Sequence, residues 1–217
     1  MKFYELTDFE IGEYSNKKIT LCSKCDNKKP IRFQIPKLYL PFGLSEFKPS
    51  YGPSKYYVDF SFKGWDQDES IVKKFYDFIR DIEDKIVKNL CENSEKIFGE
   101  VKDYDNISKK FNSNIKMPKN GMYAPNFKVK CDDTFIYDST NKLLTDEKTA
   151  GLYMKKSASA ILELSSVYFM NGQFGLVWKC YQLKLFDNVD YVDPDVISDD
   201  EEEVTGPPRL TGFQFKI

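Results

Sequence analysis

The feature that most constrains the fold is a pair of long apolar-rich segments joined at Asn171-Gly172. ASAILELSSVYFM precedes this dipeptide, and QFGLVWKCYQLKLF, residues 173–186, follows it. Asn-Gly readily adopts the backbone conformation of the two-residue turn that links antiparallel strands. We therefore predict a long β-hairpin, and a chain organised around it must be rich in β-structure.

The second strand of this hairpin has two mixed faces. Strict alternation places Trp178 and Lys184 on one face and Lys179 and Tyr181 on the other, so neither face is purely apolar. We therefore predict a bend or bulge midway along the strand, which moves side chains between the core and the surface.

Several further segments alternate apolar and polar residues, and this period of two predicts strands. The alternation is clearest in YYVDFSFKG, residues 56–64. The other predicted strands cover residues 17–22, 31–35, 38–40 and 127–131, and TFIYD (134–138) extends or pairs with the last of these.

One amphipathic helix is predicted from about Asp68 to Cys91, because apolar residues recur there at three- and four-residue intervals. Asp66 and Glu69 have a capping-box-like spacing before it. The order of elements predicts a mainly β (α+β) fold, an OB-fold-like Greek-key barrel with one long helix between the third and fourth strands. Residues 1–186 are expected to form this single domain, and an α+β sandwich is the main alternative.

Charge is distributed unevenly along the chain. Nine of the 34 acidic residues, and none of the 32 basic ones, lie between Asp187 and Glu203, so the remainder has 25 acids against 32 bases, about +7. Residues 187–217 are therefore expected to form an acidic flexible tail. The tail either aids solubility or mimics nucleic acid, competing for the basic body or recruiting replication proteins. VTGPPRLTGFQFKI follows the acids, which weakens the recruiting interpretation.

The composition argues against an enzyme. Histidine is absent, and no P-loop, dinucleotide-binding glycine turn or nucleophile elbow occurs. No cofactor is expected. The charged start and the lack of long apolar runs predict an intracellular protein without a membrane partner.

Five scattered cysteines suit reduced thiols. Cys22 and Cys25 have CxxC spacing, but they supply only two of the four ligands of a structural zinc site. A turn with two incidental cysteines is favoured over a metal or redox site, and no metal is expected.

Cations and aromatic residues recur on the polar faces of separate predicted strands. Lysine and arginine follow a phosphate backbone, whereas aromatic rings stack on bases. Ordinary solvated strand faces are the alternative interpretation. The predicted nucleic-acid-binding residues are Arg32, Tyr57, Lys63, Lys128, Lys130, Trp178, Lys179, Tyr181 and Lys184.

The succession KLYLPFG, YYVDFSFKG, a long helix and FGLVWKCYQLKLF resembles the single-stranded DNA-binding proteins of large nucleocytoplasmic DNA viruses, the group that includes the poxvirus replication protein. The resemblance covers about Ile31 to Phe186 and is most specific at Trp178-Lys179 with Gln182 and Lys184. It implies an oligonucleotide-binding fold that coats single-stranded DNA in replication, recombination and repair, in the host cytoplasm, a viral factory or the nucleus.

These observations favour a non-enzymatic protein that binds single-stranded DNA without reading its sequence. The sequence does not show whether DNA or RNA is preferred, in which polarity a strand binds, or whether the protein forms a homo-oligomer. The alternative is a virion structural or scaffold protein whose aromatic strands form protein interfaces.

Overall fold

The computed structural model describes residues 9–23, 30–119 and 121–187. Cys25 and, apart from Asp187, the predicted acidic tail lie outside the described residues. The described residues share one hydrophobic core, to which the sheet and the long helix both contribute.

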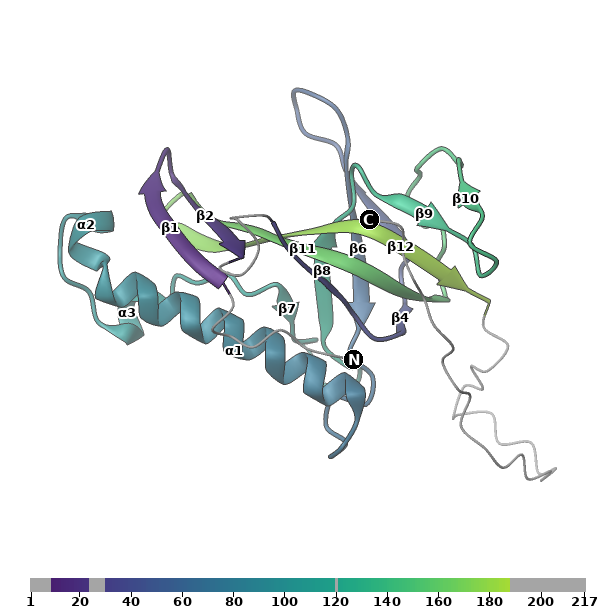
Figure 1. Ribbon diagram of the computed structural model, residues 1–217, viewed down its shortest axis with the longest axis horizontal. Helices are drawn as coiled ribbons and strands as arrows, with labels where there is room; N and C mark the ends of the chain where they lie inside the picture. The colour runs from purple at the N-terminus through teal and green to yellow at the C-terminus, as the bar shows by residue number, and fades with distance from the viewer. Residues whose placement is uncertain (1–8, 24–29, 120, 188–217) are drawn as a thin grey trace.

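Five strands close into a barrel (Figure 1). They are β4 (Leu38–Leu40), β6 (Lys55–Ser61), β8 (Asn126–Lys130), β11 (Lys156–Met170) and β12 (Gln173–Phe186). Each pairs with the next in the order β11-β4-β6-β8-β12, and pairing of β12 with β11 closes the ring. Only β8 and β12 run parallel within the ring. This is the topology of the oligonucleotide-binding barrel, so the predicted fold class is confirmed.

The helix α1 (Ile71–Glu92) is inserted between β6 and β8, the second and third strands of the barrel, not between the third and fourth. Two strands that precede it in the chain pair with β11 outside the ring, so counting strands along the sequence misplaced the helix. Its N-cap is Ser70, whose Oγ accepts a hydrogen bond of 3.1 Å from the Val72 amide, and not Asp66. No helix in the described part of the chain is long and apolar enough to span a membrane.

The apolar side of α1 packs against one side of the barrel. Figure 1 shows the helix running below the strands. The Phe75 ring lies 5.6 Å from that of Phe62 and 6.0 Å from that of Phe127. Phe78 makes an edge contact of 5.4 Å with Phe33. Because these rings bury large apolar areas, the helix and the barrel share one core.

Shorter elements extend the sheet on both sides of the ring. The strands β1, β5, β7 and β10 and the helices α2 and α3 were not predicted, because each is short and lies in a stretch rich in polar residues, proline or glycine. The added elements are β1 (Phe9–Ser15), β2 (Lys18–Ser23) and β3 (Ile31–Gln34) on the β11 side, β9 (Phe135–Tyr137) and β10 (Leu143–Leu144) on the β12 side, β5 (Leu44–Phe47) beside β6, β7 (Ile115–Lys116) beside β8, and the helices α2 (Ser94–Phe98) and α3 (Tyr104–Ser108) after α1.

The predicted hairpin and its irregular second strand are both confirmed. Asn171 and Gly172 have φ of 52° and 74°, which a two-residue hairpin turn requires at both positions. Farther along, the cross-strand pairs shift register, and Tyr181 has no partner on β11. This β-bulge ends the strict alternation of β12.

Glu83 is a buried carboxylate on α1, with 3% of its surface exposed. The Ser113 hydroxyl and the backbone amide of Asn114 donate hydrogen bonds to it over 2.8 and 3.1 Å, and Arg80 pairs with it at 3.1 Å. Asn114 in turn donates to the Lys128 carbonyl of β8. Glu83 thus ties the helix to the barrel, and burial raises the pKa of its carboxyl despite these favourable partners.

Replacing Glu83 by glutamine should make stability relative to wild type depend on pH. Because the folded state raises the pKa of Glu83, wild type loses stability as pH rises from about 4.5, the ordinary value, through the folded-state pKa. The neutral amide escapes this loss. The free energy of unfolding of E83Q relative to wild type should therefore rise over that interval and then level off, as measured by urea denaturation from pH 4 to 8. The exposed Glu92→Gln on the same helix is the control, and a pH-independent difference for E83Q would contradict the expectation.

Candidate nucleic-acid interface

Five residues lie in direct register across five neighbouring strands. Along β3, β11, β12, β8 and β6 they are Arg32, Glu163, Lys179, Lys130 and Tyr57. Paired residues of adjacent strands point to the same side of a sheet. The five side chains therefore form one continuous line around the barrel, which we name the cross-strand row.

The row faces outward, because the residues before and after each member are buried, except that Tyr56, before Tyr57, is half-buried. The exposed fractions of the side chains are 37% for Arg32, 36% for Lys130 and 49% for Lys179. These three cations are therefore accessible to a ligand while their strands stay anchored in the core.

Aromatic rings lie beside the cations of the row. The Arg32 guanidinium lies 3.8 Å from the centroid of the Tyr181 ring, the residue at the bulge. Phe135 of β9, which is 47% exposed, makes an edge contact of 6.1 Å with Tyr181. On the other side, the Lys128 ammonium lies 5.1 Å from the Tyr57 ring. Cations and partly exposed rings thus lie side by side on one surface, a combination that single-strand binding proteins use.

Glu163 occupies the row between two cations. Its carboxylate pairs with the Arg32 guanidinium at 2.9 Å and lies 3.9 Å from the Lys179 ammonium. Only 13% of its side chain is exposed, so the arginine pair is partly shielded from water. Glu163 therefore holds both cations in place and also competes with any anionic ligand for them.

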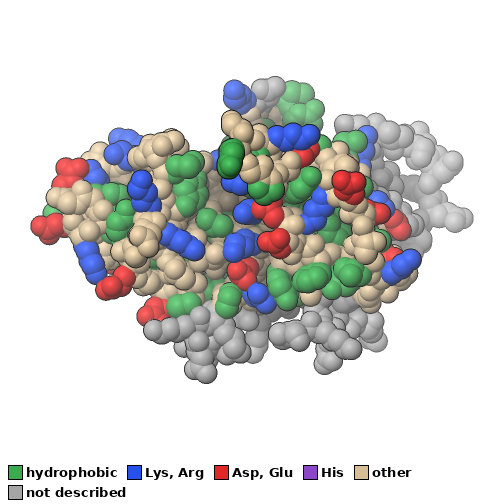
Figure 2. Space-filling model, turned by 90° about the horizontal axis from the view of Figure 1, so that it is seen from above, with side chains coloured by type: hydrophobic (Ala, Val, Ile, Leu, Met, Phe, Trp, Pro, Cys, Tyr) green, Lys and Arg blue, Asp and Glu red, His purple; other side chains and the backbone are tan. Residues whose placement is uncertain are grey.

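Two further carboxylates lie close to the row. Asp132 pairs with Lys130 at 2.9 Å, and Asp59 is the cross-strand partner of Lys128. Burial raises the pKa of Asp59, an effect that the nearby Lys128 opposes. Figure 2 shows basic, acidic and hydrophobic side chains mixed in the middle of the face seen from above. A phosphate ligand must therefore displace carboxylates from part of this surface.

Trp178 does not lie on this surface, and the prediction that it stacks on bases is wrong. Only 1% of the residue is exposed. Its ring lies 5.5 Å from Phe33 and 5.4 Å from Phe127, inside the barrel. Lys179, its neighbour, faces outward, so strand alternation puts Trp178 in the core.

Lys184 is also buried, with 3% of its surface exposed, so its predicted phosphate contact is wrong. The bulge at Tyr181 shifts the alternation of β12, and β9 and β10 add to the sheet beside it. The Lys184 ammonium donates a hydrogen bond of 2.7 Å to the Asn141 side chain in the β9–β10 turn. Burial lowers the pKa of this ammonium, and Asp138 opposes the shift.

Lys63 is exposed but lies away from the row, in the turn between β6 and α1. It is six positions after Tyr57 in the chain, and β6 already ends at Ser61, so Lys63 is not part of the strand that carries the row. The structure thus brings together six of the nine predicted residues, namely Arg32, Tyr57, Lys128, Lys130, Lys179 and Tyr181.

Sequence reasoning missed Glu163 and Phe135. Glu163 is the one charged residue in the apolar run of β11, and this isolation was the available signal. Phe135 belongs to a three-residue strand, which is too short for its periodicity to show which side faces water. In the described parts of the chain, no three Cys, Asp or Glu side chains gather as metal ligands.

No known family model and no curated protein matches the sequence. Among solved structures, the chain is similar to gp2.5, a single-stranded DNA-binding protein of bacteriophage T7, with a TM-score of 0.49 and 15% identity over 82% of this chain and 100% of that one. It is also similar to the single-stranded DNA-binding protein of bacteriophage Enc34 in complex with single-stranded DNA, with a TM-score of 0.46 and 7% identity over 81% of this chain and 93% of that one. Identities this low do not transfer the role of any residue.

Replacing Trp178 by alanine should lower the free energy of unfolding by about 3–5 kcal/mol, because a large buried ring is lost and a cavity remains. Urea denaturation followed by circular dichroism measures this change. Tyr51, which is 97% exposed, offers a matched aromatic control, and Tyr51→Ala should shift stability by no more than about 0.5 kcal/mol. A loss for W178A as small as that of the control would contradict the core position.

Proposed function

We propose that this protein binds single-stranded DNA, without reading its sequence, along the cross-strand row. The observation that carries the proposal is the direct register of Arg32, Lys179 and Lys130 on the outer face of a closed barrel. In this arrangement the three cations contact successive phosphates, and bases stack on the rings of Tyr57 and Tyr181. Phosphate contacts and stacking are both indifferent to base identity.

The surface suits a single strand better than a duplex. In a duplex the base faces are stacked on one another, so rings on a barrel wall cannot reach them. An exposed ring such as that of Phe135 can therefore stack on an unpaired base but not on a base inside a duplex.

The carboxylate of Glu163 gives the interface a built-in competitor. It aligns Arg32 and Lys179 in the free protein, which lowers the entropic cost of ordering these long side chains on binding. A phosphate group replaces it as their partner when the strand binds. Because the arriving anion must displace another anion, affinity stays moderate and the strand can be released.

We further propose that the protein coats single-stranded DNA during viral replication and recombination, inside the infected cell. The sequence resemblance to the single-stranded DNA-binding proteins of large nucleocytoplasmic DNA viruses supports this role. The resemblance is most specific at four residues. Trp178, Gln182 and Lys184 are buried, so they support a barrel shared with those viral proteins. Lys179 is exposed, so it supports a shared binding surface. Partner recruitment through the acidic tail and assembly of several copies along the strand belong to the same proposal.

Replacing Lys130 and Lys179 together by glutamine should weaken binding of oligo-dT. Each lost phosphate contact reduces the slope of log affinity against log salt by about 0.7 on single strands, so the double variant should lose about 1.4. Fluorescence anisotropy at a series of salt concentrations measures both the affinity and the slope.

The matched control is K74Q/K88Q, which removes two ion-paired lysines from the solvent side of α1. It should keep the wild-type slope. The proposal fails if wild type does not bind oligo-dT at low salt, if K130Q/K179Q retains the wild-type slope, or if duplex DNA of equal length binds as tightly as the single strand.

Glu163→Gln should strengthen binding of oligo-dT by about two- to fivefold at low salt, because Arg32 and Lys179 lose an anionic competitor whose pairs are each worth at most about 1 kcal/mol. The same anisotropy titration tests this. Glu69→Gln, which releases the exposed Lys74 near the start of α1, is the control for a change in net charge alone. Equal effects of the two variants would show that Glu163 has no special place in the interface.

A further inference from the structure

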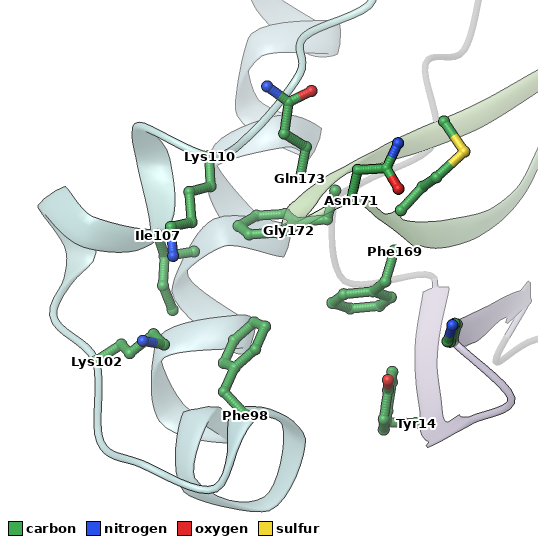
Figure 3. A pocket seen from close by; sticks show the side chains of 12 residues that line it. Tyr14, Phe98, Lys102, Ile107, Lys110, Phe169, Asn171, Gly172 and Gln173 are labelled. Carbon is green, nitrogen blue, oxygen red and sulfur yellow. The ribbon is translucent and has the colours of Figure 1, made fainter.

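A cavity of about 370 Å³ opens at the far end of the β11–β12 hairpin, outside the five-strand barrel (Figure 3). The hairpin turn, the β1–β2 turn and the segment from α2 to residue 110 form its walls. Its volume lies within the range of about 300–1,000 Å³ found for pockets that bind small molecules. The residues of the cross-strand row do not line it.

Four aromatic residues line the cavity, namely Tyr14, Phe98, Phe169 and Phe174. Tyr14 makes an edge contact of 5.0 Å with Phe169, and Phe98 lies 6.1 Å from both Phe169 and Phe174. Phe174 is buried, whereas Tyr14, Phe98 and Phe169 are only half-buried and so present ring surface to the cavity. A flat apolar ligand can therefore lie against several rings at once.

Three lysines line the same cavity, and no carboxylate of the described residues does. Lys17 comes from the β1–β2 turn, and Lys102 and Lys110 flank α3, so the cations reach the cavity from two sides. Lys17 and Lys110 are exposed, and Lys102 pairs with Glu100 and lies 5.9 Å from the Phe98 ring. In the cross-strand row, by contrast, a carboxylate lies between the cations.

The hairpin contributes two amide side chains to the cavity, Asn171 and Gln173. An amide both donates and accepts hydrogen bonds, which matches the mixed donors and acceptors on the edge of a nucleobase. Aromatic rings can stack on a base, amides can form hydrogen bonds with its edge, and ammonium groups can pair with a phosphate. This combination of groups fits a nucleotide.

We propose that this cavity binds one nucleotide, with the base against Tyr14, Phe98 and Phe169 and the phosphate at Lys17 or at Lys110. The nucleotide is either free or part of the strand bound on the cross-strand row, and the second case rests on the function proposed above. Strand β12 connects the two sites, since Phe174 and Lys179 are five residues apart, or about 17 Å along the strand.

The variant K17Q/K110Q tests the cavity against a closely matched control. Lys18 and Lys109 are exposed neighbours of the two lysines in the chain but do not line the cavity, so K18Q/K109Q removes the same charge beside it. If the cavity holds a nucleotide of the bound strand, K17Q/K110Q should bind a 15-nucleotide oligo-dT about tenfold more weakly than K18Q/K109Q does. A 6-nucleotide oligo-dT, which the row alone can hold, should bind both variants alike.

If the cavity holds a free nucleotide, dTMP should bind wild type and K18Q/K109Q saturably, but not K17Q/K110Q, with no difference between the variants on the 15-mer. Photocrosslinking of an oligomer that contains 5-iododeoxyuridine gives an independent readout. It should label Tyr14, Phe98 or Phe169 if the strand enters the cavity.

The inference is overturned if neither dTMP nor the 15-mer distinguishes the two variants. It is also overturned if a synthetic peptide of residues 197–217, which combines acids with Phe213 and Phe215, binds in a manner that depends on Lys17 and Lys110 while nucleotides do not. Failure of K130Q/K179Q to weaken oligo-dT binding would remove the function proposed for the row, and the dTMP titration would still test the cavity.

Discussion

The antiparallel pairing of β11 with β12 is the contact on which the rest of the structure depends. It extends from Ser157–Phe186 to Met170–Gln173, and five of the ten other described strands pair directly with one of its two members. β2, β3 and β4 pair with β11, whereas β8 and β9 pair with β12. The hairpin closes the barrel at one end and projects beyond it at the other. Both surfaces proposed to bind nucleotides therefore lie along the same pair of strands.

Alternation along β12 couples the core to the surface. Trp178 fills the barrel while Lys179, the next residue, joins the outer row. The bulge at Tyr181 then releases this ring from the pairing and lets Lys184 turn inward below the β9–β10 turn. One irregularity thus gives the surface an aromatic ring beside Arg32 and removes a cation from it.

The two proposed surfaces differ in their electrostatics. Glu163 lies within ion-pair distance of Arg32 and Lys179, so the row is organised before a ligand arrives. Among the residues that the structure describes, the cavity at the hairpin end is lined by three lysines and four aromatic residues and by no carboxylate. A strand that occupied both would be held mainly by exchange of ion pairs at one end and mainly by stacking at the other.

Periodicity and turn chemistry in the sequence were enough to determine the hairpin at Asn171-Gly172, the long helix, most strands and the need for a bulge, because these depend on local backbone preferences and on the spacing of apolar residues. Tertiary structure decided which individual side chains are buried and which lie on the proposed binding surface. Trp178 is in the core, Lys184 is covered and Lys63 is remote because each outcome depends on which distant strand lies alongside. The alignment of Arg32, Glu163, Lys179 and Lys130 was equally beyond the sequence, since cross-strand register joins residues as far apart in the chain as Arg32 and Glu163, which are 131 positions apart.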